Sequence, residues 1–142
     1  MKTYEIKYKS LVNPYSVVIG NNAIKLLPIR IRELCPKTKK IALFIDSNIP
    51  QKFKKKLNFL LKKYELHFLK FNSSEKNKSL KNVNKFLELL LLKNFNRTDL
   101  VISIGGGISG DVVGFISSIF KRGINFINIP TTLLAQVDAA IG

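Results

Sequence analysis

The segment ISIGGGISGD, residues 102–111, joins a strand-like apolar run to three adjacent glycines and an aspartate. Glycines permit positive φ and let the backbone approach a ligand closely. Free N–H groups at the start of a following helix attract phosphate oxygens. The pattern therefore favours binding of a diphosphate, as in a dinucleotide. It is neither G-x-G-x-x-G in a first βα turn nor a P-loop, so a glycine-rich turn that only packs a helix onto a strand stays open.

Two aspartates, Asp46 and Asp111, lie at or after the ends of expected strands and could contribute to a nucleotide site. Asp46 ends the apolar run KKIALFIDS at 39–47, where an acid can accept hydrogen bonds from ribose hydroxyls. Alternatively, Asp46 caps a turn together with Ser47 and Asn48. Asp111 follows the glycines, where it either stabilises the start of a helix or holds a sugar hydroxyl. For each aspartate, the chemistry alone leaves both a ligand-binding role and a local structural role open.

Hydroxyl and basic residues gather further along the chain. Thr131 and Thr132 follow Pro130 at the end of an apolar run, where they suit phosphate or the nicotinamide side of a cofactor, although helix capping explains one of them equally well. Arg122 precedes a glycine and suits bidentate phosphate binding, or it complements the dipole of the preceding helix. His67 is the only histidine, so we interpret it as structural or surface-exposed rather than as a metal ligand.

Strand and helix patterns alternate around these residues. Apolar strands are expected at 39–47, 65–71, 98–106 and 124–130, with helices at 50–64, 79–94 and 109–123. Two short paired strands at 3–9 and 15–20 and a helix at 23–34, kinked or shifted by Pro28, come before them. Apolar strands that alternate with helices predict an α/β fold, with a Rossmann-like parallel sheet covered by helices on both faces.

The expected sheet also predicts where a ligand binds. In parallel α/β sheets, ligands bind beyond the carboxyl ends of the strands. The loops that begin there carry polar, glycine or hydroxyl residues, and they span 45–48, 72–78, 105–111 and 130–138. We expect one domain over residues 1–142 with its site at this edge.

Composition and charge argue against several other classes of protein. The single cysteine, Cys35, cannot form an internal disulfide, and no Cys/His cluster suggests a zinc finger. No apolar run reaches the roughly 20 residues that a membrane span needs, so we expect a soluble, cytoplasmic protein without a membrane partner. The net charge of +15 is spread over the polar sides of patterned segments, which favours a solvated basic surface over nucleic-acid binding.

Three stretches together, GGGISGD, SEKNKSL and KRGINFINIPTTLLAQVDAAIG, resemble the 3-dehydroquinate synthase family of sugar-phosphate cyclases. The resemblance covers essentially the whole chain and is densest over residues 99–142. Metal-dependent polyol and alcohol dehydrogenases share a glycine-rich loop and a proline-threonine pair but not LLAQVDAAIG. The resemblance implies NAD as cofactor, a small sugar phosphate as substrate and a homodimer when the enzyme is complete.

The resemblance also implies roles for particular residues. Cofactor contacts are implied for Asp46, Asn48, Glu75, Lys78, Gly106, Gly107, Gly110, Asp111, Thr131 and Thr132. Asp138 resembles a catalytic acid that contacts the substrate, and Arg122 resembles the arginine that reaches the neighbouring subunit's phosphate site in family dimers. Ser73 and Ser74 stand where the family usually has Asp-Gly, so the local turn is expected to differ.

The family pattern continues with a second glycine and a lysine, and then with a helical domain whose glutamate and two histidines bind zinc or cobalt. We therefore expect these 142 residues to be the N-terminal nucleotide-binding part, without a metal site of their own and inactive alone. The implied reaction converts 3-deoxy-arabino-heptulosonate 7-phosphate to 3-dehydroquinate and phosphate, a lyase step of the shikimate pathway to aromatic amino acids.

Two alternatives remain. One is another sugar-phosphate cyclase or a polyol-phosphate dehydrogenase of the same superfamily, which differs in its products because only a cyclase releases phosphate without net NADH. The other is a basic nucleic-acid-binding module, whose affinity would fall steeply with salt concentration because it would depend on many phosphate contacts.

Overall fold

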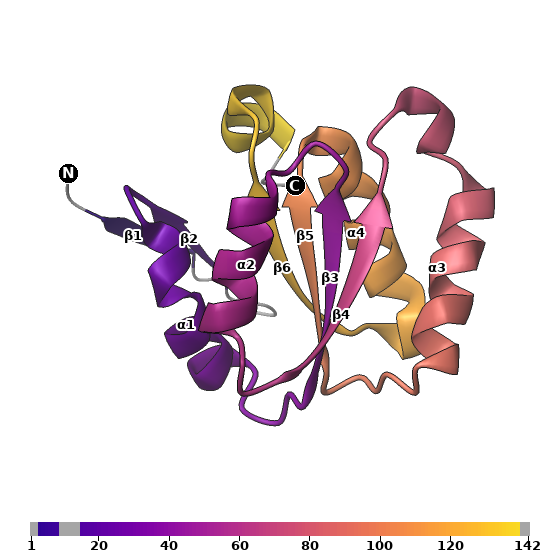
Figure 1. Ribbon diagram of the computed structural model, residues 1–142, viewed down its shortest axis with the longest axis horizontal. Coiled ribbons are helices and arrows are strands. Elements are labelled where there is room, and N and C mark those ends of the chain that lie inside the picture. Colours follow the sequence, from indigo (N-terminus) through magenta and orange to yellow (C-terminus); the bar gives the residue numbers. More distant parts are fainter. Residues whose placement is uncertain (1–2, 9–14, 140–142) are drawn as a thin grey trace.

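The structure is a computed structural model that describes residues 3–8 and 15–139 (Figure 1). Its centre is a parallel four-stranded sheet in the order β4-β3-β5-β6. The strands are β3 (Lys40–Asp46), β4 (Glu65–Phe71), β5 (Leu100–Gly105) and β6 (Asn125–Pro130). This confirms the expected α/β fold with a parallel, Rossmann-like sheet.

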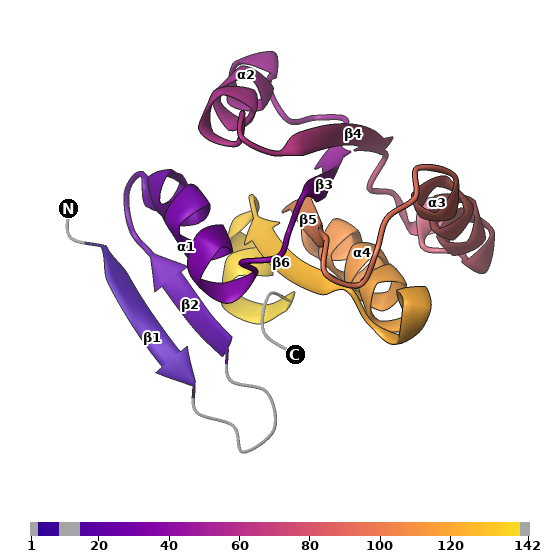
Figure 2. The same ribbon diagram turned by 90° about the horizontal axis from the view of Figure 1, so that it is seen from below.

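Helices cover both faces of the sheet (Figure 2). They are α1 (Leu27–Leu34), α2 (Gln51–Leu60), α3 (Leu80–Leu92) and α4 (Gly107–Ile119). Alternate residues of the strands point to opposite faces. On one face Leu43 and Ile102 pack with Ile31 of α1 and Leu57 of α2, and the other face of the sheet packs against α3 and α4. Both faces are thus buried, which explains why the central strands are apolar runs rather than alternating patterns.

The strand order creates a topological switch point between β3 and β5. From β3 the chain passes through α2 to β4 on one side, then returns through α3 to β5 on the other side of β3. Ligands of open α/β sheets bind in the crevice at such a point, outside the carboxyl ends of the strands. The strands end together here, since Asp46 is in register with Phe71 and Gly105 with Pro130.

The N-terminal strands β1 (Tyr4–Tyr8) and β2 (Tyr15–Ile19) form a separate antiparallel pair, and the expected turn between them lies outside the described residues. A 3₁₀ turn, Ala23–Leu26, leads into α1, whose first turn contains Pro28. Proline is tolerated there because its missing N–H has no intrahelical acceptor in the first turn. The predicted shift of this helix by Pro28 is therefore confirmed.

Two details differ from the sequence expectations. Helix α4 begins at Gly107 rather than Ser109, because the glycines themselves form its first turn. The helical spacing of Leu80, Val83, Phe86, Leu87, Leu90 and Leu91 predicts that all six face the core, but in α3 only Val83, Phe86 and Leu90 are buried, whereas Leu80 and Leu91 are exposed. Among the described residues, no helix is long and apolar enough to cross a membrane.

Candidate active site

The first turn of α4 supplies the anion-binding groups of the site. Gly106 is the N-cap residue, and the first helical bond runs from the N–H of Gly110 to the carbonyl of Gly106 at 3.2 Å. The N–H groups of Gly107, Ile108 and Ser109 have no backbone partner in the described part of the chain. Because they lie at the positive end of the helix dipole, they suit a phosphate.

Close packing, not an unusual backbone dihedral, explains Gly105. The glycines of this motif do not use the positive φ that glycine permits, since positive φ among the described glycines occurs at Gly20 and Gly123. A Cβ on Gly105 would lie 2.8 Å from Cβ of Ser109 and 3.2 Å from Cβ of Asp46. Glycine here lets the helix start directly above the end of β5, next to β3.

Asp46 lies at this same edge, 5% exposed. Its Oδ1 accepts a hydrogen bond of 2.7 Å from the N–H of Asn48, which is the turn-capping role that the sequence left open. Its Oδ2 has no partner among the described residues, so one carboxylate oxygen remains available for a ribose hydroxyl. The side chain of Asn48 is exposed at the start of the same loop.

Thr131 and Thr132, which follow β6, contact the first two glycines of the motif. The N–H of Thr131 donates to the carbonyl of Gly105 at 2.8 Å, and Thr132 lies against Gly106, 3.4 Å from the position of an added Cβ. Oγ1 of Thr132 also accepts from the N–H of Ala135 at 3.3 Å, which is the capping role expected for one threonine. The Thr131 hydroxyl makes no such bond in the described part of the structure.

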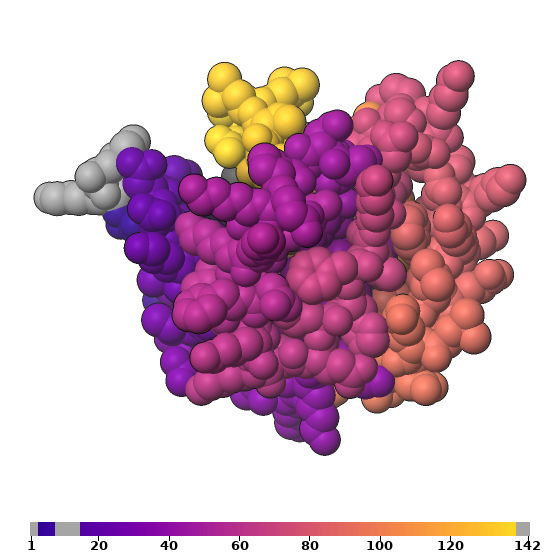
Figure 3. Space-filling view, viewed as in Figure 1, coloured from indigo at the N-terminus to yellow at the C-terminus, as the bar shows by residue number. Residues whose placement is uncertain are grey.

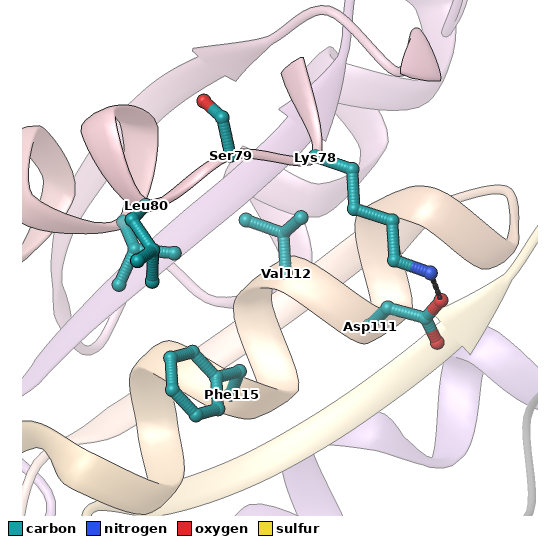
Figure 4. Close-up of a pocket in the computed structure, with 7 residues that line it drawn as sticks. Lys78, Ser79, Leu80, Asp111, Val112 and Phe115 are labelled. Carbon is teal, nitrogen blue, oxygen red and sulfur yellow. Dashed lines mark hydrogen bonds and ion pairs between the residues drawn. The ribbon is translucent and has the colours of Figure 1, made fainter. Parts of the chain in front are cut away.

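Lys78 and Asp111 form an ion pair above the start of α4 (Figure 4). The ammonium of Lys78 donates to Oδ2 of Asp111 at 2.8 Å and thereby joins the loop after β4 to α4. Glu75 lies in the same loop, on the 3₁₀ turn Glu75–Asn77. The pair borders a pocket of about 210 Å³ between α3 and α4 whose other walls are mainly apolar. This volume is too small for a dinucleotide, so the pocket is not the proposed cofactor site.

The hydrogen bond to Asp111, the charge of Asp111 and the charge of Glu75 outweigh desolvation and raise the pKa of Lys78 above its ordinary value of 10.5. A raised lysine pKa adds stability that is present below the ordinary value and is lost as pH rises through the raised one. Between pH 6 and 9 Lys78 therefore stays charged, and its own ionisation adds no pH dependence to the free energy of unfolding.

We predict that Asp111→Asn lowers the pKa of Lys78 towards its ordinary value, because the variant removes the negative charge that holds the proton. NMR titration of the lysine side-chain signals at alkaline pH measures this shift. Glu88→Gln is the matched control, since it removes an exposed acid from α3 with the same change in net charge. An unchanged Lys78 titration in Asp111→Asn would show that the ion pair does not exist in solution.

Two contacts at this edge were missed from the sequence. The hydroxyls of Ser73 and Ser109 are hydrogen-bonded to each other, and Ser109 is buried in α4. The side chain of Asn128, in β6, approaches Gly110 so closely that an added Cβ would lie 3.1 Å from it. The signals available in the sequence were a polar residue, Ser109, within an expected helix and another, Asn128, within an expected apolar strand.

Arg122 is not brought together with these residues. It lies at the opposite end of α4, in a turn where Lys121 has φ 49°, Arg122 φ 68° and Gly123 φ 114°. Lys121 is tied down by a 2.7 Å hydrogen bond to the carbonyl of Phe95, while Arg122 is exposed. The turn borders a groove of about 800 Å³ at the amino-terminal edge of the sheet, with Lys37 and Arg97 also in its wall.

Asp138 and His67 lie in two other parts of the structure. Asp138 is exposed on the π-helical turn Ala135–Ala139, in the C-terminal segment that projects from the molecular surface, yellow in Figure 3. His67 pairs with Glu65 at 2.7 Å and packs edge-on against Phe95, in keeping with a structural role. Within residues 3–8 and 15–139, no group of three or more His, Cys, Asp or Glu could hold a metal ion.

Comparison with known protein sequences points to one family. The model of the 3-dehydroquinate synthase N-terminal family matches residues 68–142. The 3-dehydroquinate synthase of Pelagibacter ubique is 47% identical over 142 residues, which is all of this chain and 39% of that protein. The enzyme of the same name from Sulfurisphaera tokodaii is 44% identical over 92% of this chain and 34% of its own length. The chain thus spans less than two-fifths of these relatives.

Two solved synthase structures share the fold. A 2-deoxy-scyllo-inosose synthase, solved with carbaglucose-6-phosphate, NAD⁺ and Co²⁺, matches with a TM-score of 0.84 and 24% identity over 95% of this chain and 36% of its own. A 2-epi-5-epi-valiolone synthase from Streptomyces hygroscopicus, solved with NAD⁺ and Zn²⁺, matches with a TM-score of 0.68 and 24% identity over 82% of this chain and 33% of its own. At this identity the likeness concerns the fold.

Proposed function

Because the chain belongs to the 3-dehydroquinate synthase N-terminal family, we propose that residues 1–142 form the nucleotide-binding part of a sugar-phosphate cyclase. The reaction we assign is the conversion of 3-deoxy-arabino-heptulosonate 7-phosphate to 3-dehydroquinate and inorganic phosphate, in aromatic amino acid biosynthesis. The supporting observation is the convergence at the switch point of the α4 amides, Asp46 and Thr131–Thr132.

These residues fit NAD⁺ by their chemistry. The amides of Gly107, Ile108 and Ser109 are donors for the diphosphate, and Oδ2 of Asp46 is an acceptor for a ribose hydroxyl. The absence of a side chain at Gly106, the N-cap residue, leaves the approach to these amides open. When bound, NAD⁺ would supply reversible hydride transfer at a substrate carbon; while that carbon is oxidised to a ketone, the neighbouring C–H is acidic enough for phosphate elimination.

We assign the remaining roles by family resemblance. Glu75, Lys78 and Asp111 line the cofactor side from the loop after β4 and the start of α4, and Asp138 contacts the substrate. Arg122 lies at the far end of α4 from these residues, which agrees with service to the phosphate site of a neighbouring subunit in a homodimer. We also assign a divalent metal, zinc or cobalt, to the complete enzyme, since the solved neighbours hold Co²⁺ and Zn²⁺.

Calorimetry with NAD⁺ tests the proposal on this chain. We expect weak binding, with a dissociation constant of roughly 0.1–1 mM, because diphosphate and one ribose supply most of the contacts. Asp46→Asn should weaken NAD⁺ binding by about tenfold or more, since it replaces a charged acceptor, yet leave competition by inorganic pyrophosphate unchanged. A coupled phosphate assay should detect no turnover by these residues alone.

Three outcomes would contradict the proposal. Cyclase turnover by the 142 residues would show that no further protein part is needed. NAD⁺ binding that is indifferent to Asp46→Asn and to pyrophosphate would place the nucleotide elsewhere. Binding to DNA or RNA with a steep negative dependence on salt, and none to NAD⁺, would favour a nucleic-acid-binding module.

A further inference from the structure

The pocket between α3 and α4 has no ligand in the function proposed above. Its volume is about 210 Å³ (Figure 4). Sites for drug-sized ligands usually measure about 300–1,000 Å³, so this pocket suits a smaller molecule. Its walls define which kind of small molecule that is.

Most of the wall is apolar, and part of it is left uncovered. Val83 and Val112 are buried, whereas Leu80 is 71% exposed and Phe115 48%. Leu80 is the first residue of α3 and Phe115 lies in α4, so the two exposed side chains flank the pocket from different helices. An apolar group placed between them would remove apolar surface of both from water, which is favourable.

One end of the pocket carries two opposite charges that have unused hydrogen-bonding capacity. The ammonium of Lys78 donates to Oδ2 of Asp111 at 2.8 Å. An ammonium has three N–H donors, so two remain, and Oδ1 of Asp111 accepts no bond from any described residue. The two side chains are 50% and 45% exposed. A ligand can therefore reach both charges without breaking the ion pair.

This arrangement is complementary to a zwitterion with an apolar tail. A carboxylate fits the remaining donors of Lys78, and an ammonium fits Oδ1 of Asp111. A purely anionic ligand would also meet the charge of Asp111, and a purely cationic one the charge of Lys78, and like charges repel. An α-amino acid carries its two charges on one carbon atom, so they are adjacent, as are those of the protein pair.

We propose that this pocket binds a free α-amino acid with a large apolar side chain. Its carboxylate contacts Lys78 and its ammonium Asp111, while its side chain lies between Leu80 and Phe115. An aromatic side chain fits best, because the Phe115 ring can pair with it edge to face. Since Lys78 and Asp111 are also assigned to the cofactor, a bound amino acid would weaken nucleotide binding; this consequence, unlike the site itself, rests on the proposed function.

An NMR titration with L-phenylalanine, without nucleotide, tests the site on the isotope-labelled 142-residue chain. We expect saturable shifts confined to residues 78–83 and 111–115, with a dissociation constant on the order of 1 mM. Phenylpropionate lacks the ammonium and phenylethylamine lacks the carboxylate. Each should bind about tenfold more weakly or worse, because each loses a hydrogen bond between charged groups. L-Alanine has both charges but little apolar surface, and it should not reach saturation.

Two variants separate the apolar wall from the charges. Leu80→Ala should weaken phenylalanine binding about threefold or more, because it removes buried apolar contact. Leu92→Ala is the matched control, since it truncates a similarly exposed leucine of α3 outside the pocket, and it should leave binding unchanged. Asp111→Asn should weaken the binding of phenylalanine about tenfold but not that of phenylpropionate, which has no ammonium.

Three results would overturn the proposal. The first is the absence of saturable shifts in residues 78–83 and 111–115. The second is equal affinity for phenylalanine and phenylpropionate, which would remove the role of Asp111. The third is an equal loss of affinity in Leu80→Ala and Leu92→Ala, which would place the ligand outside this pocket.

Discussion

Gly106→Asp is expected to abolish nucleotide binding without loss of stability. Gly106 has the extended N-cap conformation, φ −80° and ψ −171°, and an added Cβ would be 3.4 Å from its nearest neighbour, Cγ2 of Thr132. Aspartate is a favoured N-cap residue, so its carboxylate would sit on the amides that we assign to the diphosphate. A unit charge about 4 Å from a phosphate costs roughly 4 kcal/mol at the effective dielectric constant of a protein surface, on the order of a thousandfold in affinity.

Gly106→Asn separates charge from shape, because asparagine caps the helix equally well and is neutral. We expect Asn to weaken NAD⁺ binding by only about tenfold, since it competes for one donor, and the difference between the two variants to shrink as salt is added. Calorimetry and thermal unfolding measure both quantities. Equal losses of affinity in Asp and Asn, or a fall in melting temperature with either, would mean that the phosphates do not bind at this helix start.

Gly105→Ala is expected to have the largest effect on stability. Its Cβ would lie 2.4 Å from Oγ and 2.8 Å from Cβ of Ser109, and 3.2 Å from Cβ of Asp46. Rotating the Ser109 hydroxyl relieves only the first contact, so the start of α4 must move away from the ends of β3 and β5. Overpacking of this kind typically costs about 1–3 kcal/mol. Urea unfolding measures the loss, and nucleotide binding should fall with it because the amides move.

Gly114→Ala is the matched control for that experiment. A Cβ there would meet the Phe126 ring at 3.5 Å, an ordinary contact, in the middle of α4. Alanine in a helix interior is favoured over glycine by up to about 1 kcal/mol, so the two Gly→Ala changes, nine positions apart, should have opposite signs. If both stabilise the protein, the close approach of Ser109 to Gly105 is not rigid in solution.

The position of the site could be predicted from the sequence because the pattern shows where the buried strands end. Buried β3 and β5 are apolar on both faces and stop abruptly at Asp46 and at the glycines, so the edge of the sheet could be located by pattern. Parallel pairing then brings Asp46, Gly105 and Pro130 to one level. The roles of these residues towards a nucleotide stay predictions.

Contacts between loops could not be predicted in the same way. The reason for Gly105 is a side chain four positions later together with one on a neighbouring strand, and periodicity does not encode such distances. The Ser73–Ser109 hydrogen bond likewise joins a loop to a helix that are distant in sequence. The Glu5–Arg30 ion pair likewise joins β1 to α1 across 25 positions of sequence, a contact that strand alternation cannot predict.

The adjacency of β3 and β5 has a kinetic consequence. Each ladder of the main sheet joins parallel strands across a helix, and the ladder that pairs Ile41 with Leu100 encloses all of α2, β4 and α3. Loop-closure entropy grows with the length of chain enclosed, and pairings of this kind slow folding. The β3–β5 pairing beside Asp46 is therefore the one in the main sheet with the largest entropic cost of closure. A ligand that contacts both strands would stabilise this pairing once it has formed.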